Sequence, residues 1–267
     1  MSDANVSNLY ATMNIELNKI SSWIQANKLS LNVGKSVYLL FKGKREILEV
    51  PQLKIFNQVI TRKTDAKFLG IHIDDNLNWK IHAQYVSAKV ARMIGILYKL
   101  RSNLTMQALR TLYLSMVHPH LRYGLIFWGA APKVNLNPII VQQKKLIRLI
   151  NHAGYIEHSE PLFRKSYILK FEDLIENEMI KFIFRDLLPS NEHFNFTYRT
   201  SIHGHNARNQ SSLNLPQPRT ALLRDSVFFR GLALFNGVPL HIRTAPSLNS
   251  FKYQLKNLYI ECYVNSS

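Results

Sequence analysis

Two adjacent carboxylates, Asp74 and Asp75, follow an apolar run at 68–73. Paired aspartates after a strand can hold two metal ions for phosphoryl transfer. A polymerase needs that pair in a tight turn between two strands, but the residues after Asn78 follow a helical pattern. Asp and Asn also suit turns and helix N-termini. We therefore favour a turn-and-cap role over a metal site, with Asp65 only a weak candidate for a third ligand.

A second motif, Gly-Lys-Ser at 34–36, matches the end of a phosphate-binding loop. Such a loop requires an earlier glycine, where this chain has Leu29, and it joins a strand to a following helix. Here a helical pattern comes first and a strand-like run, 37–41, comes second. We interpret 32–36 as a turn between a helix and a strand, in which Gly34 supplies the permissive backbone.

The histidine pairs His118/His120 and His203/His205 have no cysteine or carboxylate at ligand spacing. A structural zinc site uses four ligands. We therefore expect the first pair at a helix end beside the core and the second in a polar loop. The sequence contains neither G-x-S-x-G nor H-E-x-x-H, and its one cysteine, Cys262, excludes an internal disulfide. No metal site is predicted.

The chain of 267 residues carries 34 Lys and Arg against 17 Asp and Glu, a net charge of +17. This excess indicates a polyanionic partner, nucleic acid first and an acidic membrane surface second. The 46% hydrophobic residues suffice for a core, and most aromatics lie at core spacing. No run is apolar enough to span a membrane, and the polar N-terminus is unlike a signal peptide, so we expect a nuclear or cytoplasmic protein. The basic residues recur along the chain, at 42–45, 62–63, 144–145 and 164–165.

Hydrophobic periodicity divides the chain into an α+β part and a helical part. The first part has a helix at about 5–25, a strand at 36–41, a hairpin at 53–60 turning at Asn57-Gln58, and a strand at 67–73. Together these predict a small antiparallel sheet beside a helix. The second part has helices at about 81–97, 105–117, 139–150, 171–187 and 247–259, and a loop at 191–218. We expect Thr105 to cap the second of these helices and Pro119 to stop it.

The ordered motifs resemble one family. Trp23 begins W-x-x-A-N-K-L-S-L-N, and Lys35-Ser36 and a short strand follow. Next come K-F-L-G-I-H-I-D at 67–74, W-K-I-H at 79–82 and Y-G-x-x-x-W-G at 123–129. This order resembles the reverse transcriptase (RNA-directed DNA polymerase) of non-LTR, LINE/jockey-like retrotransposons, just downstream of its catalytic motif. The tail motifs at 215–220 and 234–239 extend the resemblance over nearly the whole chain.

The resemblance implies three domains: the end of the palm with a primer-grip-like hairpin at 1–75, a thumb-like helical bundle at 76–152, and a basic C-terminal region at 153–267. It implies RNA or an RNA/DNA template–primer as partner, and no membrane. Lys35 is expected near the incoming triphosphate or the template–primer, with a structural turn lysine as the alternative. The implied nucleic-acid-binding residues are Lys35, Phe68, Leu69, Gly70, Lys80, Lys89, Arg92, Lys99, Arg101, Lys144, Lys145 and Arg148.

One departure limits the implied activity. The family's aromatic-Ala-Asp-Asp hairpin is expected upstream of Asn8, where this sequence starts, so no catalytic residue is assigned. Without those carboxylates, metal ions cannot be held for nucleotide transfer, and Mg²⁺ is expected only for the full-length polymerase. We expect a nucleic-acid-binding fragment that does not polymerise DNA alone. The alternatives are part of an active polymerase whose N-terminal half lies outside this sequence, and a non-functional decayed copy.

Overall fold

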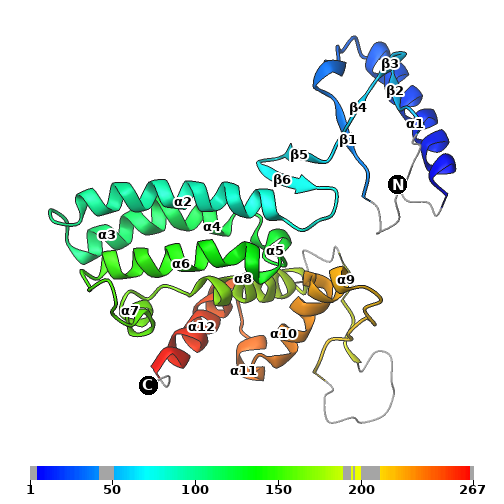
Figure 1. The fold of residues 1–267 in the computed structure, drawn as a ribbon. Coiled ribbons are helices and arrows are strands. Elements are labelled where there is room, and N and C mark those ends of the chain that lie inside the picture. The colour runs from blue at the N-terminus through cyan, green and yellow to red at the C-terminus, as the bar shows by residue number, and fades with distance from the viewer. Residues whose placement is uncertain (1–4, 42–50, 189–193, 195, 200–210, 265–267) are drawn as a thin grey trace. The chain divides into compact units, whose positions relative to one another are not determined.

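A computed structural model describes all residues except 1–4, 42–50, 189–193, 195, 200–210 and 265–267 (Figure 1). The chain forms two compact units, Met1–His82 and Ala83–Ser267. The described part is mostly helical with small sheets, which confirms the α+β class. Among the described helices, none combines the length and apolarity that a membrane span requires.

The first unit is organised by helix α1, Val6–Ala26. Asn5 caps it, because the Asn5 side chain accepts a hydrogen bond from the Ser7 N–H at 2.9 Å. Tyr10 and Leu17 are buried one above the other on α1, as the predicted helical spacing requires. They form a core with the buried side chains of Leu40, Leu53, Ile55 and Ile60.

The strands of this unit form three two-stranded sheets rather than the expected single antiparallel sheet. β1 (Val37–Leu39) pairs in parallel with β4 (Thr61–Lys63), which sequence patterns did not reveal because the partners are far apart in the chain. The antiparallel pairs are β2 (Lys54–Ile55) with β3 (Gln58–Val59), and β5 (Asp65–Phe68) with β6 (Ile71–Asp74).

Both hairpins correct the predictions. The first turns at Phe56 and Asn57, whose φ angles are 49° and 59°, one residue earlier than predicted. The predicted continuous strand at 67–73 is wrong, because Leu69 (φ 46°) and Gly70 (φ 86°) reverse the chain there. Two consecutive residues with positive φ give the backbone twist that suits a two-residue hairpin loop.

The second unit is a bundle of helices (Figure 1). Along the chain its main elements are α2 (Lys80–Leu100, which starts in the first unit), α3 (Met106–Leu112), the π-helical η2 (Tyr113–Val117), α4 (His118–Arg122), α5 (Leu125–Trp128), α6 (Lys133–Ile150), α7 (Ser159–Lys165) and α8 (Phe171–Asp186). The C-terminal elements are α9 (Ala221–Asp225), π-helical η4 (Val227–Gly231), α10 (Leu232–Gly237), α11 (Leu240–Arg243), α12 (Leu248–Glu261) and the 3-10 turn η5 (Cys262–Val264).

A buried amide fixes the middle of this bundle. Gln143 of α6 donates through Nε2 to the Tyr113 hydroxyl at 2.9 Å and to the Leu169 carbonyl at 3.0 Å. Tyr113 is fully buried, and burial raises its pKa to about 12. Because these polar groups satisfy one another, their burial does not cost the stability that an unpaired group would.

Two predicted helix ends are corrected here, at Pro119 and at the start of α6. Thr105 caps α3, accepting the Ala108 N–H at 3.3 Å, as predicted. Pro119 does not stop the helix, because it occupies the first turn of α4, where a missing N–H costs little. Helix α6 starts at Lys133, six residues before the predicted start, and contains Pro138. Most of the predicted loop at 191–218 lies outside the described residues.

Candidate nucleic-acid interface

The Asp74 carboxylate holds the turn that leads into α2. Its Oδ1 accepts the N–H of Asn76 at 3.2 Å and of Asn78 at 3.0 Å, and its Oδ2 accepts the N–H of Trp79 at 2.8 Å. Asp75 Oδ1 accepts from the Asn76 side-chain amide at 2.8 Å. Both aspartates are buried. This network confirms the turn-and-cap role.

These carboxylates do not fit a two-metal centre. Asp65 lies opposite Asp74 in the β5–β6 register, as a third ligand might. However, both oxygens of Asp74 already accept backbone hydrogen bonds, and the described residues contain no group of three His, Cys, Asp or Glu that could hold a metal ion. Metal ligation would compete with the hydrogen bonds that hold the turn.

The Gly-Lys-Ser motif is a turn, as predicted. It forms the 3-10 helix η1, Val33–Lys35, between α1 and β1, and the Asn32 side chain accepts the Lys35 N–H at 3.1 Å. The role expected for Gly34 is wrong, because Gly34 does not have a positive φ, and an added Cβ would meet only Asn32 Oδ1, at 3.5 Å. The Lys35 side chain is exposed.

The β5–β6 hairpin presents an apolar tip in the first unit. Phe68 is 63% exposed and Leu69 is 74% exposed. Gly70, with φ 86°, completes the turn without the steric penalty of a side chain. The hairpin tip therefore exposes two large apolar side chains.

The histidines serve the structure. His118, at the start of α4, has its pKa lowered to about 4, first by burial and then by Arg122. His82 is buried, and its Nδ1 accepts the His72 N–H at 3.3 Å. Burial, then the charge on His72, lowers the pKa of His82 to about 4. His203 and His205 lie outside the described residues.

Helix α2 carries four of the predicted contact residues. Lys80, Arg92 and Lys99 are exposed, and Lys89 is half-buried with its ammonium 5.5 Å from the centre of the Tyr85 ring. Their long side chains can extend from the helix toward a phosphate backbone.

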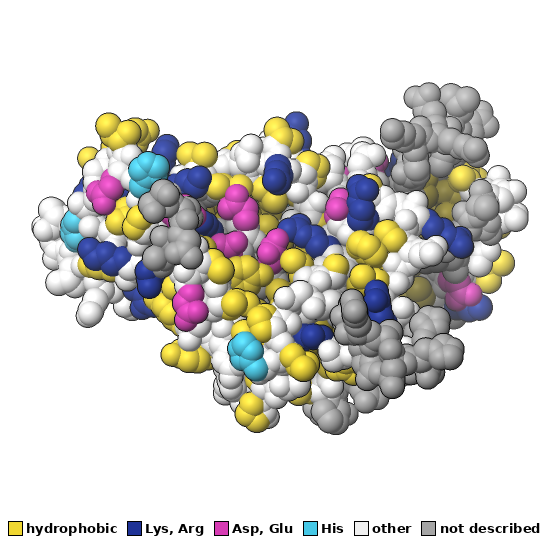
Figure 2. Space-filling view, turned by 90° about the horizontal axis from the view of Figure 1, so that it is seen from below, with side chains coloured by type: hydrophobic (Ala, Val, Ile, Leu, Met, Phe, Trp, Pro, Cys, Tyr) yellow, Lys and Arg dark blue, Asp and Glu magenta, His cyan; other side chains and the backbone are white. Residues whose placement is uncertain are grey.

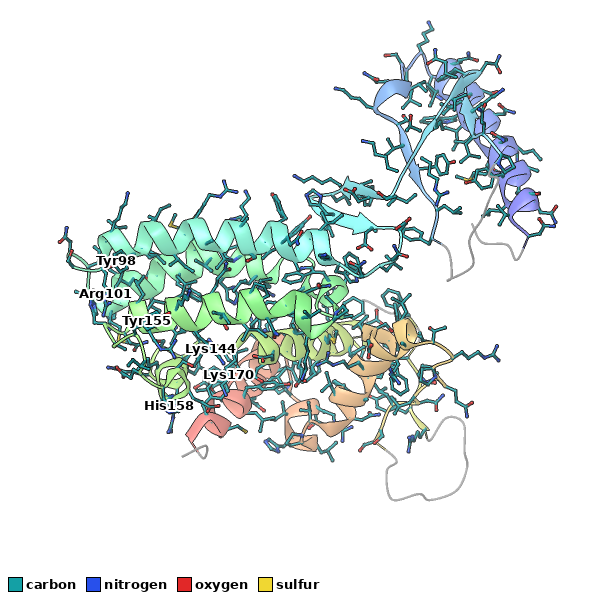
Figure 3. All side chains as sticks on the ribbon, viewed as in Figure 1. Tyr98, Arg101, Lys144, Tyr155, His158 and Lys170 are labelled. Atoms are coloured by element: carbon teal, nitrogen blue, oxygen red, sulfur yellow. The ribbon has the colours of Figure 1, made fainter. Side chains whose placement is uncertain are left out.

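The other predicted cations lie on α6 and beside it. Lys144 and Lys145 are exposed. Arg101, just after α2, donates to the Ala153 carbonyl at 3.0 Å, and Arg148 donates to the Glu157 carbonyl at 2.6 Å. These bonds place Arg101 and Arg148 on the loop that follows α6. Tyr98, Arg101 and Tyr155 lie at this end of the bundle in Figure 3.

Helices α2 and α6 run parallel. Gln142 of α6 donates to the Ser87 hydroxyl of α2 at 2.9 Å, and further along the same two chain segments Arg101 reaches Ala153. Since Ser87 lies beside Gln142, Lys89 and the lysines at 144–145 occupy about the same position along the two helix axes. Seven of the predicted residues lie on these two helices and in the segments that directly follow them. We call them the α2–α6 cations: Lys89, Arg92, Lys99, Arg101, Lys144, Lys145 and Arg148.

The stretch of sequence that carries these cations contains no carboxylate. Between 76 and 156 the chain has eleven Lys and Arg residues and not one Asp or Glu. Within the described part of the chain, none of the α2–α6 cations forms an ion pair. Figure 2 shows the molecule from below, the side away from α2 in Figure 1, and there Asp and Glu side chains lie among the Lys and Arg ones. Runs of adjacent basic residues do not reveal this feature, because it is the absence of Asp and Glu from a long stretch of the chain.

Comparison with known proteins finds several with a similar sequence. The chain is 27% identical over 173 residues to the RNA-directed DNA polymerase from mobile element jockey of Drosophila melanogaster, covering 63% of this chain and 19% of that protein. Two D. melanogaster proteins described as probable RNA-directed DNA polymerases also match. The one from transposon BS is 24% identical over 62% of the chain, and the one from X-element is 26% identical over 77%. The chain is therefore similar in sequence to RNA-directed DNA polymerases of non-LTR retrotransposons.

The chain spans about a fifth of the length of these reverse transcriptases, 19% of the jockey and BS proteins and 21% of the X-element protein. No family model matches the sequence, and no solved structure matches the fold. The relationship therefore rests on sequence similarity, with motifs in the order that the sequence analysis described.

The Y-G-x-x-x-W-G block of the reverse-transcriptase resemblance has a structural explanation. Gly124 adopts φ 62°, and a Cβ on Gly129 would lie 2.5 Å from the Leu125 carbonyl oxygen. Trp128 is fully buried, donates through Nε1 to the Tyr123 carbonyl at 2.9 Å, and stacks on the Phe171 ring at 5.6 Å. The block packs α5 onto α8, and it leaves the side chains of Tyr123 and Phe127 about half exposed.

Proposed function

We propose that this chain binds an RNA/DNA template–primer through the α2–α6 cations, as part of a retrotransposon reverse transcriptase. In this proposal 1–75 corresponds to the end of the palm, 76–152 to the thumb and 153–267 to the C-terminal region. Lys35, Lys80 and the hairpin tip at 68–70 add contacts from the first unit. A nucleic-acid partner of this class places the working protein in the nucleus or the cytoplasm.

The observation that carries the proposal is the acid-free stretch at 76–156. Cations on two parallel helices with no carboxylate among them repel one another, and a row of phosphates relieves that repulsion while releasing counterions. The named activity of the relatives, RNA-directed DNA polymerase, supplies a ligand with such a row.

We also propose that these 267 residues do not extend a primer unaided. The adjacent pair Asp74 and Asp75 caps a turn, so no Mg²⁺ centre forms there. Purified protein incubated with Mg²⁺, deoxynucleotides and an annealed primer should give no extension product. Extension above a no-enzyme control would refute this part of the proposal.

Binding is tested by titrating the purified chain into a short labelled RNA/DNA hybrid at several salt concentrations. The logarithm of the association constant should fall linearly with the logarithm of salt concentration, with a slope of roughly −0.9 per phosphate contacted. Six contacts therefore give a slope of about −5. A slope near zero would mean that the cations do not contact phosphates.

A further inference from the structure

A groove in the second unit is separate from the α2–α6 cations. It runs between α4, α5, α8 and α12, with a volume of about 480 Å³, and an inner pocket of about 190 Å³ lies next to it, beside Tyr167. Arg122, Glu178 and Lys181 line both cavities, so the two adjoin each other. Volumes of this size match those of sites that enclose part of a small ligand.

The groove is strongly cationic. Its lining contains Arg122, Lys181, Arg185, Lys252 and Lys256, and the only carboxylate among its lining residues is Glu178. Glu178 is already shared, by Arg122 at 2.9 Å and by Lys181 at 3.1 Å.

Three of these cations, Arg185, Lys252 and Lys256, have no carboxylate partner within the part of the chain that the structure describes. The Lys256 ammonium lies 4.0 Å from the centre of the Tyr167 ring. Burial, together with Arg110 and Lys181, lowers the pKa of Lys256 to about 8. The inner pocket therefore holds a positive charge that a bound anion would stabilise.

Aromatic side chains line the outer part. Tyr123 and Phe127 of the Y-G-x-x-x-W-G block are 55% and 54% exposed. Phe182 also lines this part, and the Arg185 guanidinium carbon lies 5.8 Å from the centre of its ring. The packing of Trp128 and Gly129 fixes the short helix that carries Phe127, so these rings are presented from a rigid element.

We propose that this groove binds a single-stranded nucleic acid. Phosphate groups contact Arg185, Lys252 and Lys256, and an unpaired base stacks on Tyr123 or Phe127. A cationic groove with exposed rings is the arrangement that binds single strands with little sequence preference. A duplex hides the faces of its bases, and an acidic peptide would use the cations but leave the rings without a partner.

This inference does not depend on the proposed function. Binding of a hybrid duplex concerns the α2–α6 cations, whereas single-strand binding concerns residues on α4, α5, α8 and α12. Variants in the groove should leave hybrid binding nearly unchanged, so either proposal can fail while the other holds.

The test uses the whole 267-residue chain and fluorescein-labelled oligo-U and oligo-dT strands. The double substitution Arg185→Gln/Lys252→Gln should weaken single-strand binding about tenfold, since each lost phosphate contact reduces affinity. Arg164→Gln/Lys165→Gln is the matched control, because it removes the same charge from exposed residues of α7. Equal losses in the two variants would overturn the proposal.

The aromatic contribution is tested in the same assay. Phe127→Ala should weaken binding about tenfold through lost stacking. Tyr253→Ala, at a 65% exposed tyrosine of α12 that does not line the groove, should leave binding unchanged. No difference between the two would argue against stacking. Tighter binding of oligo-U would identify RNA as the strand, and tighter binding of oligo-dT would identify DNA; both support the groove.

A measurement on the unmodified protein covers the case in which a variant fails to fold. An oligonucleotide containing a photoreactive uracil analogue is crosslinked to the protein, which is then digested with trypsin. The crosslinked base should appear on the peptide at 123–133, which contains both Tyr123 and Phe127. Crosslinks confined to other peptides would overturn the proposal.

Discussion

Helices α6 and α8 pack against each other, yet their charged residues have different partners. Helix α6 has Lys and Arg but no Asp or Glu, and its lysines at 144–145 point into solvent. Helix α8 holds five carboxylates. Glu176 bonds to Arg230 at 3.1 Å and to the Tyr259 hydroxyl at 3.3 Å, and Asp173 accepts from the Tyr263 hydroxyl.

In this bundle, several charged residues of α8 form bonds within the fold, whereas the lysines of α6 are exposed to solvent. Contacts of α8 join the C-terminal elements to the bundle, so its carboxylates stabilise the fold. Burial, followed by the carboxylate of Glu176, raises the pKa of Tyr259, as expected for a hydroxyl held against an anion. Among the described residues, Lys144 and Lys145 of α6 have no carboxylate partner, which is why we propose that they bind another molecule. Substitutions on α8 should alter stability, and those on α6 should alter binding.

The largest effect should come from Glu178→Ala. This change leaves Arg122 and Lys181 beside each other without their shared carboxylate, and Lys181 is only 18% exposed. We expect the free energy of unfolding to fall by about 2–3 kcal/mol, less than for a fully buried pair because Arg122 is half exposed. Denaturant titration measures this. Glu261→Ala, at an exposed residue of α12, is the control, and an equal change in both variants would contradict the interpretation.

Acid should have the next largest effect. The pKa of His118 is lowered to about 4, whereas an unfolded histidine titrates near 6.5. As the pH falls through this window the unfolded chain binds the proton first, so stability present above pH 6.5 is lost progressively down to about pH 4. At pH 5 the loss should be about 2 kcal/mol. His118→Gln should reduce the pH dependence of unfolding between pH 7 and 5 without abolishing it, because the pKa of His82 is also lowered to about 4. An unchanged profile would exclude this origin.

On α6, Lys144→Gln/Lys145→Gln should weaken binding of the RNA/DNA hybrid about tenfold at moderate salt, with a slope reduced by roughly 1.8. The melting temperature should not change, because neither lysine has an ion-pair partner among the described residues. Arg164→Gln/Lys165→Gln again controls for net charge. A lower melting temperature with unchanged hybrid binding would mean that the α6 lysines stabilise the fold rather than bind nucleic acid.

The smallest effect concerns Gly95 in the middle of α2. A Cβ added there would meet nothing within 4 Å. Gly95→Ala should therefore raise the free energy of unfolding by about 1 kcal/mol through helix propensity alone. Thermal unfolding checks the stability, and a parallel hybrid titration shows whether the added methyl group obstructs the ligand. A destabilised variant would mean that α2 packs differently from the structure described.

Local signals predicted the long helices well. The predicted bounds of α1, α2, α8 and α12 agree closely with the structure, and the caps at Thr105 and Asn5 agree with their residue types. The buried face of α1 was predicted less well, because Ile20 and Trp23 are 47% and 60% exposed. Prediction failed where two local rules compete. Pro119 is a helix breaker in the interior but acceptable in a first turn, and only the π-helical segment before it decides between them. Leu69 lies in an apolar run that predicts a strand, yet the hairpin turn requires a positive φ there.

The candidate site was predicted only in part. The separate cations on α2 and α6 were identified from the sequence. Which residues of α2 lie beside which residues of α6 depends on the parallel alignment of the two helices, seen in the hydrogen bond from Gln142 to Ser87, and no local pattern encodes it. The groove was missed for the same reason. Arg122, Lys181 and Lys252 lie far apart in sequence, and each looks like an ordinary solvated cation until α4, α8 and α12 pack together.

The burial of Trp128 gives the second unit an optical reporter of its own. Trp23 is 60% exposed in the first unit, whereas Trp128 is sealed against Phe171. An indole in an apolar core emits at shorter wavelength than one in water. The blue part of the emission spectrum should therefore follow the melting of the helical bundle, while emission at longer wavelength reports on Trp23 and the partly buried Trp79 of the first unit, all in one unlabelled sample.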